Sequence, residues 1–420
     1  MRIWLLKDGE LLPTDGKDVR LLRMGLLANE LSRRGHQVIW WTSTLNHFKK
    51  EFRVACDKDM RVDSNYLVKL LHGPGYQKNI SFQRIFHNRV IAKRFLQAAQ
   101  EEERPDIVLA SLPTIEFALA ATQYGKQYNV PVILDLRDMW PDIFVDIMPK
   151  FLRIFARIAL EWQFHAMYDA CKNATALFGI SQGFLNWGLQ YAARERGLFD
   201  AVYPLAYPDT LLDRSVVDEL SQFWRQQGIY KNKNDFILVY AGSLVSSHRI
   251  NSVIETVKFL GNDVKLVIAG QGPLLAEYQR LSQDCPNIIF TGWIDKLKLL
   301  SLLKMCTVGV ANSSHSGQRR DCVMSVSNKV AEYFSAGLPV ITNLPITSEL
   351  GKKISENRCG FCYRENDGNS LIRIIEELKN NHQLLEAMSV NARILYESEF
   401  VAEKIYANMC DHLEKIATKV

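Results

Sequence analysis

The sequence has no long hydrophobic run. None of its apolar stretches reaches the roughly 18 consecutive residues that a membrane-spanning helix needs. The N-terminus consists of Met1-Arg2, a short apolar segment and Lys7-Asp8, and it lacks the longer apolar segment and cleavage site of a signal peptide. We therefore expect a cytoplasmic protein, with peripheral contact to the inner face of the cell membrane left open.

Charge of one sign is also scarce. The net charge is +5 over 420 residues, and the chain is 47% hydrophobic and 23% charged, as in ordinary globular proteins. Such a small and dispersed excess suits an anionic substrate but does not predict nucleic-acid binding. The length allows two or three domains, and two is the default expectation.

Signs of disulfides, of a zinc-protease motif and of a P-loop motif are missing as well. Eight scattered cysteines without an export signal indicate free thiols. The pair Cys359-Gly-Phe-Cys362 has neither a second pair for zinc nor the helix start of a redox motif, which favours structural thiols. No H-E-x-x-H or Walker sequence occurs, and the nine histidines show no metal spacing. We therefore expect no metal and no cofactor.

What is present is a regular alternation of strands and helices. A strand at Arg2–Leu6, a helix at Asp18–Arg34 ended by Gly35, and a strand at Gln37–Thr42 predict a βαβ opening and a parallel sheet. The connecting loop, which includes Gly16, is not G-x-G-x-x-G, so a dinucleotide fingerprint is absent. Further strands are expected at Tyr66–Leu71, Asp106–Ser111, Val130–Leu134, Thr175–Ser181 and Ala201–Leu205, and helices at Arg84–Glu102 and Glu116–Tyr128.

The stretch Ile147–Cys171 reads as a long helical segment of unusual composition. It combines several large apolar residues with Lys150, Arg153 and Arg157. A basic, aromatic, amphipathic helix can lie on a membrane surface through residues 147–165, but such a stripe more often packs against a core. Both interpretations stay open at this stage.

The second half repeats the alternation after a boundary near residues 205–210. Strands are expected at Phe236–Ala241, Val264–Ala269, Asn287–Thr291, Thr307–Ala311, Pro339–Thr342 and Arg358–Tyr363. Helices are expected at Ile250–Leu260, Pro273–Gln283, Leu297–Met305, Lys329–Ala336, Ser370–Asn380 and, with a break near Ser398–Val401, Glu386–Val420. Two such halves predict an α/β protein with two doubly wound Rossmann-like domains facing a central cleft.

The block Ser327–Ile341 is the most informative part of the chain. Its first half has helical spacing, Gly337 and Pro339 end the helix, and a short buried strand follows. Lys329 in the first turn works against the helix dipole unless an anion binds there. This suggests a phosphate near Lys329 and hydroxyl groups near Glu332, although a solvated pair on an ordinary surface helix is equally compatible with the spacing.

Four glycine-bearing or polar segments follow successive strands of the second half. They are 240–243 with Gly242 and Ser243, 269–273 with Gly270 and Gly272, 290–293 with Trp293, and 312–321 with Ser313, Arg319 and Asp321. Parallel strands bring their carboxyl ends to one sheet edge, so these segments predict a phosphate and ribose pocket together with Arg249. In the first half, Asp135-Leu-Arg137-Asp138-Met-Trp-Pro141 also follows a buried strand, where ligands bind open α/β sheets. A local ion pair that fixes the loop is the alternative for this segment.

These motifs resemble the retaining glycosyltransferases of family 4, which have the GT-B fold. In the C-terminal half the matching pieces are Tyr-Ala-Gly-Ser at 240–243, Val-Ile-Ala-Gly-Gln-Gly-Pro at 267–273, Phe-Thr-Gly-Trp at 290–293, the block at 327–340 and Cys-Gly-Phe at 359–361. The N-terminal half resembles the bacterial surface-polysaccharide branch, including the fucosamine-transferase-like enzymes, at 34–38, 42–48, 105–108, 111–113 and 136–141.

The resemblance implies transfer of a sugar, with retention, from a nucleoside-diphosphate sugar, with UDP the favoured nucleotide. The acceptor would be lipid-linked or a saccharide, in the synthesis of lipopolysaccharide O-antigen or capsule. It also implies an acceptor-binding domain at 1–205, a nucleotide-sugar-binding domain at 206–395, and a C-terminal helix at 396–420 that packs back on the first domain. A GT-B epimerase or phosphorylase, and a non-catalytic nucleotide-sugar-binding protein, remain as alternatives.

By the same resemblance, Glu332 binds the ribose hydroxyls, Lys329 and Arg249 hold the diphosphate, and Asp138 holds the acceptor. Two positions depart from the family pattern: Met324 stands where a second glutamate is frequent, with Asp321 close by, and Ser243 stands where an arginine is usual. Arg319 or Arg320 is the candidate to compensate. The complete set of expected site residues is Arg249, Lys329 and Asp138 for catalysis and Gly16, Arg137, Gly242, Ser243, Gly270, Gly272, Trp293, Ser313, Arg319, Asp321 and Glu332 for substrate binding.

Overall fold

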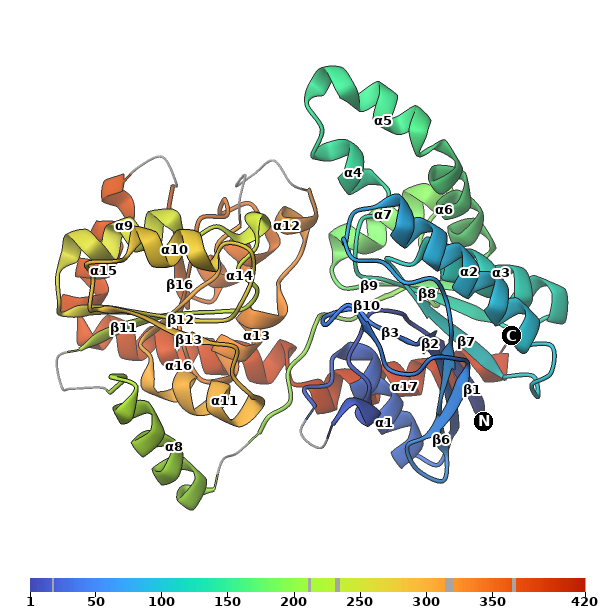
Figure 1. Cartoon of the computed structure of the whole chain (residues 1–420), viewed down its shortest axis with the longest axis horizontal. Helices are drawn as coiled ribbons and strands as arrows, with labels where there is room; N and C mark the ends of the chain where they lie inside the picture. Colours follow the sequence, from blue (N-terminus) through green and yellow to red (C-terminus); the bar gives the residue numbers. More distant parts are fainter. Residues whose placement is uncertain (17–18, 211–212, 231–234, 314–319, 365–367, 420) are drawn as a thin grey trace. The chain divides into compact units, whose positions relative to one another are not determined.

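The structure, a computed structural model, describes residues 1–16, 19–210, 213–230, 235–313, 320–364 and 368–419. It consists of two compact units (Figure 1). Unit 1 comprises Met1–Pro204 and Glu403–Val420, and unit 2 comprises Leu205–Ala402. Each unit is built on a parallel or mostly parallel sheet with helices on both faces, which confirms the predicted pair of doubly wound α/β domains.

The sheet of unit 1 has eight strands in the order β10-β9-β8-β7-β1-β2-β6-β5, and only β5 runs antiparallel to its neighbour. The strand order reverses between β1 and β7, so a ligand-binding crevice is expected at the carboxyl ends of these two strands. The bounds are β1 Arg2–Leu6, β2 Gln37–Ser43, β5 Lys58–Arg61, β6 Tyr66–Leu71, β7 Ile107–Ser111, β8 Val132–Leu136, β9 Ala176–Gly179 and β10 Ala201–Val202, and a small hairpin pairs β3 Leu45–Asn46 with β4 Glu51–Phe52.

Helices cover both faces of this sheet. In Figure 1, α2, α3, α6 and α7 lie on one face and α1 and α17 on the other. Their bounds are α1 Arg23–Arg33, α2 Phe82–Ala98, α3 Ile115–Tyr128, α4 Asp142–Asp146, α5 Arg153–Ala159, α6 Glu161–Asn173, α7 Gln182–Ala192 and α17 Ala402–Lys419, with short 3-10 turns η1 Pro13–Asp15 and η2 Lys150–Leu152.

Helix α1 begins later than the sequence pattern indicates. The predicted start was Asp18, which lies outside the described residues, and the helix begins at Arg23. The side chain of Glu10 accepts a hydrogen bond from the backbone N–H of Met24 at 3.1 Å, and this satisfies one of the free donors of the first turn. A residue from the preceding loop therefore caps the helix, which no local pattern could indicate.

The predicted helical segment Ile147–Cys171 is helical over most of its length but is interrupted. The chain forms η2, α5 and α6, and Leu160 between the two helices has φ −103° and ψ 9°. Helix α6 buries a face that includes Met167 and Ala170, whereas α5 has no buried residue. Packing against the core therefore accounts for the orientation of α6 but not for that of α5. Helix α7 was not predicted either, although Ser181 caps it by accepting a hydrogen bond from Phe184 N at 3.3 Å.

The sheet of unit 2 has six parallel strands in the order β13-β12-β11-β14-β15-β16, with the reversal between β11 and β14. The strands are β11 Phe236–Ala241, β12 Val264–Ala269, β13 Ile288–Gly292, β14 Val308–Val310, β15 Val340–Thr342 and β16 Gly360–Cys362. The helices are α8 Arg214–Gln226, η3 Ser246–His248, α9 Asn251–Leu260, α10 Leu275–Leu281, α11 Lys296–Met305, α12 Arg320–Met324, α13 Asn328–Ser335, α14 Glu349–Glu356, α15 Gly368–Asn380 and α16 His382–Glu399. Of these, α12 and α14 were not predicted.

Both faces of the unit 2 sheet are buried, and β11 shows this directly. Ile237 and Val239 belong to the core cluster on one face, while Leu238 and Tyr240 belong to the cluster on the other. A strand covered on both sides is typical of doubly wound folds and explains why β11 reads as a continuous apolar run. Among the described residues, no helix combines the length and apolar character needed to cross a membrane.

Candidate active site

The reversal point of the unit 2 sheet is occupied by residues from three segments. Gly242 follows β11, Asn312 and Ser313 follow β14, and helix α13 lies beneath both strands. Tyr333 of α13 fixes this arrangement, because its hydroxyl accepts from Ala241 N at 2.8 Å and donates to Val310 O at 3.3 Å. The first turn of α13 is thereby held at the sheet edge where ligands bind in such folds.

Lys329, in the first turn of α13, carries an ammonium group in an unusual environment. Its Nζ atom is buried and has no hydrogen-bond partner among the described residues. The atom lies 4.2 Å from the centre of the Tyr240 ring, and a Cβ at Gly242 would stand 3.3 Å from it. Burial lowers the pKa of Lys329 to about 7, since the charged form loses its hydration. The solvated-surface interpretation of this lysine is therefore wrong.

Glu332 lies one turn further along α13 and is only 1% exposed. The sequence pattern placed it beside the apolar face of the helix, and the structure places it among the buried polar residues of unit 2. A carboxylate and an ammonium on consecutive turns of one buried helix are an arrangement that can bind a polar, anionic ligand.

The glycines after β12 allow a close contact between two loops. A Cβ at Gly270 would stand 1.9 Å from Gly242 O, and a Cβ at Gly272 would stand 2.4 Å from Leu244 O. Both glycines therefore allow the loop after β12 to pack directly on the loop after β11. Backbone hydrogen bonds join the two loops, from Gly242 N to Ala269 O and from Leu244 N to Gln271 O, both at 2.9 Å. Loop packing therefore requires both glycines, and their contact with a substrate stays a prediction.

Arg249, Ser243 and Trp293 lie at the surface. Arg249 forms an ion pair with Glu277 of α10, with 3.1 Å between Nη1 and Oε1, and its side chain is 44% exposed. Ser243 is exposed, and its carbonyl oxygen accepts from Tyr240 OH at 2.9 Å. Trp293 is 71% exposed. The structure therefore brings Gly242 and Lys329 together, and it leaves Arg249 engaged with an acidic neighbour.

The segment after β14 is held by side-chain amides that the sequence analysis did not single out. Ser313 N donates to Asn343 Oδ1 and Asn343 Nδ2 donates to Ser313 O, both at 2.8 Å. Asn312 Nδ2 donates to Tyr363 OH at 2.5 Å. Asp321 and Met324 lie on the short helix α12, and Arg319 lies outside the described residues. In the sequence, the asparagines that follow strands, Asn312 after β14 and Asn343 after β15, could have indicated this hydrogen-bond network.

Unit 1 has a charged cluster at its own reversal point, which sequence reasoning also missed. Asp8, just after β1, accepts from Ser43 Oγ at 2.6 Å and from Ser43 N at 3.2 Å. His87 of α2 accepts from Gly75 N at its Nδ1, so its Nε2 carries the proton and faces Asp8 Oδ2 at 3.8 Å. Burial raises the pKa of Asp8, but His87 and Ser43 outweigh it and hold that pKa well below its usual range.

A second group in unit 1 combines cations with aromatic rings. His47 Nδ1 lies 2.6 Å from Tyr76 OH, and Lys50 Nζ lies 4.7 Å from the centre of the Tyr76 ring. Arg84 stacks 4.4 Å over the ring of Trp140. Burial, followed by the charges of Lys50 and Arg84, lowers the pKa of His47 to about 4, so this histidine is neutral at pH 7.

The segment after β8 forms a buried ion-pair network. Arg137 Nε lies 2.9 Å from Asp135 Oδ2, its Nη1 donates to Glu10 Oε1 at 2.5 Å, and Asp135 Oδ1 also accepts from Arg23 Nη2 at 2.9 Å. The predicted substrate-binding role of Arg137 therefore competes with a structural one, because this guanidinium already pairs with two carboxylates. Asp138 is half-buried and accepts from Met139 N at 2.9 Å.

Gly16 follows η1 and is exposed. A Cβ at this position would meet only Val19 Cγ2, at 3.5 Å, so local packing does not require a glycine here.

Among the described residues, no group of three or more His, Cys, Asp or Glu side chains could hold a metal ion. All eight cysteines are free, and burial raises the pKa of Cys359 to about 12 and of Cys362 to about 11.

Two family models match the chain, one on each half. Residues 24–195 match "Glycosyltransferase Family 4", and residues 222–395 match "Glycosyl transferases group 1". A search of curated proteins finds no significant match.

Solved structures agree with the fold over the full length. HepE from Anabaena, solved in complex with UDP and glucose, has a TM-score of 0.68 at 14% identity and covers 99% of this chain and 100% of its own. Sucrose-phosphate synthase from Thermosynechococcus elongatus has a TM-score of 0.72 at 14% identity, with complete coverage of both chains. WaaG, a glycosyltransferase involved in lipopolysaccharide biosynthesis, has a TM-score of 0.65 at 15% identity, with coverage of 99% and 98%. This chain therefore belongs to the family 4 glycosyltransferases and has the GT-B fold.

Proposed function

We propose that this enzyme transfers a sugar from a UDP-sugar, with retention, to a lipid-linked or saccharide acceptor of a cell-surface polysaccharide. The donor binds to unit 2 and the acceptor to unit 1. The nucleotide assignment is supported by the likeness to HepE, which was solved with UDP and with UDP-glucose. The donor-side residues are Lys329, Glu332 and Gly242.

The observation that carries the proposal is the buried ammonium of Lys329. An isolated charge is expensive to bury, and a folded protein keeps one where a ligand of opposite charge completes the site. The group stands beside a glycine at the reversal point of the sheet, where backbone can approach a phosphate closely. A diphosphate is the anion that fits the enzyme class.

In this proposal the cations stabilise the leaving group. The bond between the anomeric carbon and the β-phosphate oxygen breaks, and the diphosphate gains negative charge next to Lys329. Preorganised cations in a dry site are typically worth several kcal/mol for such a step. The acceptor oxygen bonds to the anomeric carbon on the same face, and its proton passes to a phosphate oxygen of UDP. This step conserves charge and protons without a further base or a metal ion.

Other residues take binding roles. Glu332 accepts hydrogen bonds from the ribose hydroxyls, since it lies one turn after Lys329 on α13. Arg249 is exposed and binds the diphosphate by exchanging its partner Glu277 for phosphate oxygens. Asp138, at the carboxyl end of β8, accepts a hydrogen bond from the acceptor hydroxyl.

Product analysis tests the reaction. The purified enzyme is incubated with UDP-glucose or UDP-N-acetylglucosamine, with and without a polyprenyl-diphosphate-linked sugar, and UDP and nucleotide sugars are separated by chromatography. We expect UDP release only when the acceptor is present. A new nucleotide sugar formed without acceptor would instead indicate an epimerase, and binding of the UDP-sugar without any product would indicate a non-catalytic binding protein.

The pH dependence of UDP binding provides a second test. In the free enzyme Lys329 loses its proton as the pH rises through about 7, whereas a bound diphosphate raises the pKa and keeps the group charged. The contribution of Lys329 to the affinity should therefore be full below pH 7 and should fall by up to about tenfold per pH unit above it. Calorimetry in buffers of different ionisation enthalpy should show proton uptake near pH 8.

A matched variant separates this effect from titration of the nucleotide. The UDP phosphate titrates at roughly pH 6, below this window, and it does so equally with every variant. In Lys329→Met the slope above pH 7 and the proton uptake should both disappear. Equal slopes in the wild type and the variant would contradict the role of Lys329.

A further inference from the structure

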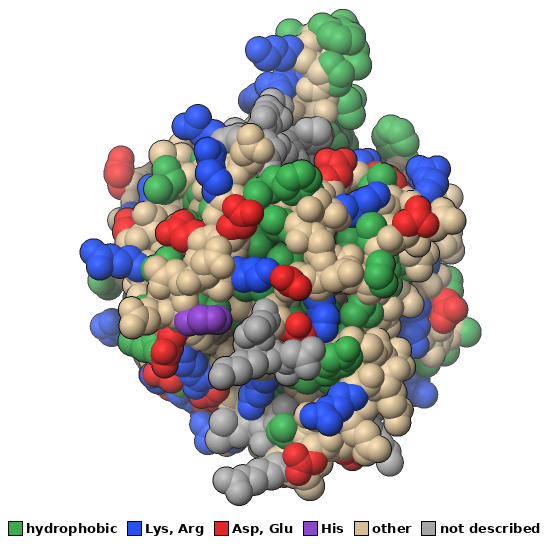
Figure 2. All heavy atoms as spheres, turned by 90° about the vertical axis from the view of Figure 1, so that its left-hand side faces the viewer, with side chains coloured by type: hydrophobic (Ala, Val, Ile, Leu, Met, Phe, Trp, Pro, Cys, Tyr) green, Lys and Arg blue, Asp and Glu red, His purple; other side chains and the backbone are tan. Residues whose placement is uncertain are grey.

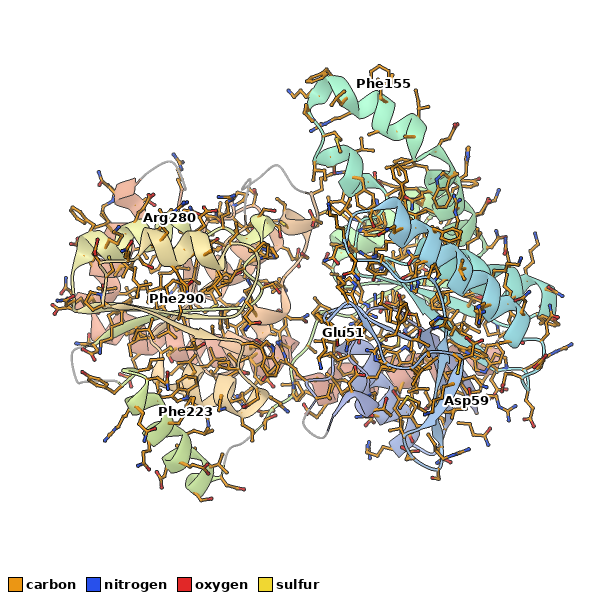
Figure 3. All side chains as sticks on the ribbon, viewed as in Figure 1. Glu51, Asp59, Phe155, Phe223, Arg280 and Phe290 are labelled. Atoms are coloured by element: carbon orange, nitrogen blue, oxygen red, sulfur yellow. The ribbon has the colours of Figure 1, made fainter. Side chains whose placement is uncertain are left out.

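Helix α5 and the turn before it form an exposed apolar projection of unit 1. We call residues 147–158 the prong. Phe151 is 74% exposed, and Ile154 and Phe155 are each 65% exposed. Figure 1 shows α5 standing away from the sheet of its unit, and Figure 3 shows Phe155 on the outer surface of this helix. The large exposed apolar side chains of the prong are Ile147, Met148, Phe151, Leu152, Ile154, Phe155 and Ile158.

The charges of the prong have one sign. Lys150, Arg153 and Arg157 are basic, and no acidic residue occurs between 147 and 160. Arg153 donates from Nε to Met148 O at 3.2 Å and from Nη2 to Asp146 O at 3.1 Å, which joins the end of α4 to the start of α5. In Figure 2 the projection at the top shows hydrophobic side chains beside basic ones. The exposed apolar side chains of the prong therefore lie on a segment that is held by the hydrogen bonds of Arg153 and is flanked by basic side chains.

A second exposed apolar patch lies at the start of α2 in the same unit. Ile80 is 64% exposed, Phe82 88% and Phe86 60%. Two ring contacts connect this helix to the root of the prong. Arg84 lies 4.4 Å over the Trp140 ring, and Trp140 lies 4.5 Å from Phe144 of α4. Helix α2 thus contacts Trp140, in the chain that leads through α4 to the prong.

We propose that the prong docks on the surface of an anionic lipid bilayer. A convex tip with no acidic residue suits a bilayer, because Phe and Ile can enter the boundary between headgroups and acyl chains. Lysine and arginine side chains then stay at the depth of the lipid phosphates. A long hydrophobic segment is not required, since two weak signals, apolar and basic, add on one short element. Docking would place unit 1 beside a lipid-linked acceptor, but it does not depend on the proposed reaction.

Vesicle co-sedimentation of the full chain tests the proposal. The vesicles contain phosphatidylcholine alone or phosphatidylcholine with 30% phosphatidylglycerol. We expect binding to the anionic vesicles that weakens with added salt, and little binding to the neutral ones. The combined variant Phe151→Ser, Ile154→Ser and Phe155→Ser should lose binding on the order of 100-fold. The variant Lys150→Glu with Arg157→Glu should lose the preference for anionic vesicles.

A control and a competing outcome make the test decisive. Phe259→Ser removes an equally exposed aromatic side chain, 75% exposed, from unit 2 and should bind vesicles like the wild type. All variants should keep the wild-type affinity for UDP, so failure of docking and failure of the proposed reaction are distinguishable. Unchanged vesicle binding in the triple variant would overturn the proposal. So would a concentration-dependent dimer that the triple variant loses, since a second copy would then cover the prong.

Discussion

Replacing Lys329 with methionine should weaken UDP binding roughly 30- to 1000-fold, which corresponds to about 2–4 kcal/mol, and should make the unliganded protein more stable. The two effects have one cause. In the free enzyme the ammonium is buried without a hydrogen-bond partner among the described residues, so the fold bears its desolvation cost. An apolar side chain of similar length removes that cost together with the attraction for the diphosphate. Isothermal titration calorimetry and differential scanning calorimetry measure the two effects separately.

The opposite signs distinguish a binding residue from a structural one. Loss of a structural lysine would lower both the melting temperature and the affinity, whereas here the melting temperature should rise while the affinity falls. Lys304→Met is the matched control, because this lysine lies on the exposed side of α11 in the same unit. It should change neither quantity appreciably. A Lys329→Met protein with wild-type UDP affinity would remove Lys329 from the site.

Replacing Asp135 with asparagine should destabilise unit 1 by about 3–5 kcal/mol, the usual cost of leaving buried charges uncompensated. Asp135 is fully buried and pairs with Arg23 and Arg137, whose side chains are 2% and 10% exposed. Burial raises the pKa of Asp135, but the two arginines outweigh burial and hold it below its usual value. Arg23 also donates to the carbonyl oxygens of Tyr203 and Pro204, so the variant loosens the chain as it leaves unit 1.

Calorimetry measures this effect as a lower melting temperature. A unit of this size loses roughly 2–4 °C per kcal/mol, which gives about 6–20 °C. Because the pKa of Asp135 is depressed in the folded state, its contribution is present above the unfolded pKa and is lost as the pH falls through the folded value. Asp59→Asn is the control, since Asp59 is 55% exposed in its ion pair with Lys69 and lies at the periphery of unit 1 (Figure 3). A shift of Asp135→Asn no larger than that of the control would show that the network is not structural.

Prediction from the sequence succeeded where the pattern is local. The strands and most helices of both units follow from apolar periodicity and from glycine or proline at their ends. The block Ser327–Ile341 was recognised as a helix that runs into a strand, and α13 and β15 have these positions. The glycine-bearing strand ends were placed at one sheet edge because parallel strands of one sheet must share that edge.

Prediction failed where a distant residue decides the outcome. The start of α1 depends on Glu10, and the break before α6 depends on which helix the core accepts. Arg137 pairs with Glu10 of another segment in addition to its expected neighbour Asp135. The close packing of Gly270 on the loop after β11 was not predicted either. None of these contacts leaves a trace in the spacing of nearby residues.

The sequence by itself determined the alternation of strands and helices, the two-unit organisation of the sheets, and the candidate segments at the strand ends. It could do so because hydrophobic periodicity and turn residues act within a few positions of the chain. Only the tertiary structure decided which candidates are charged, buried or already paired. Lys329 is the clearest case. Its spacing in the sequence is equally compatible with a solvent-exposed side chain and with a binding site. In the structure its ammonium group is buried because Tyr240 and Gly242, almost ninety positions earlier in the sequence, pack against it. Burial and pKa are properties of the assembled neighbourhood, and folding alone brings those neighbours together.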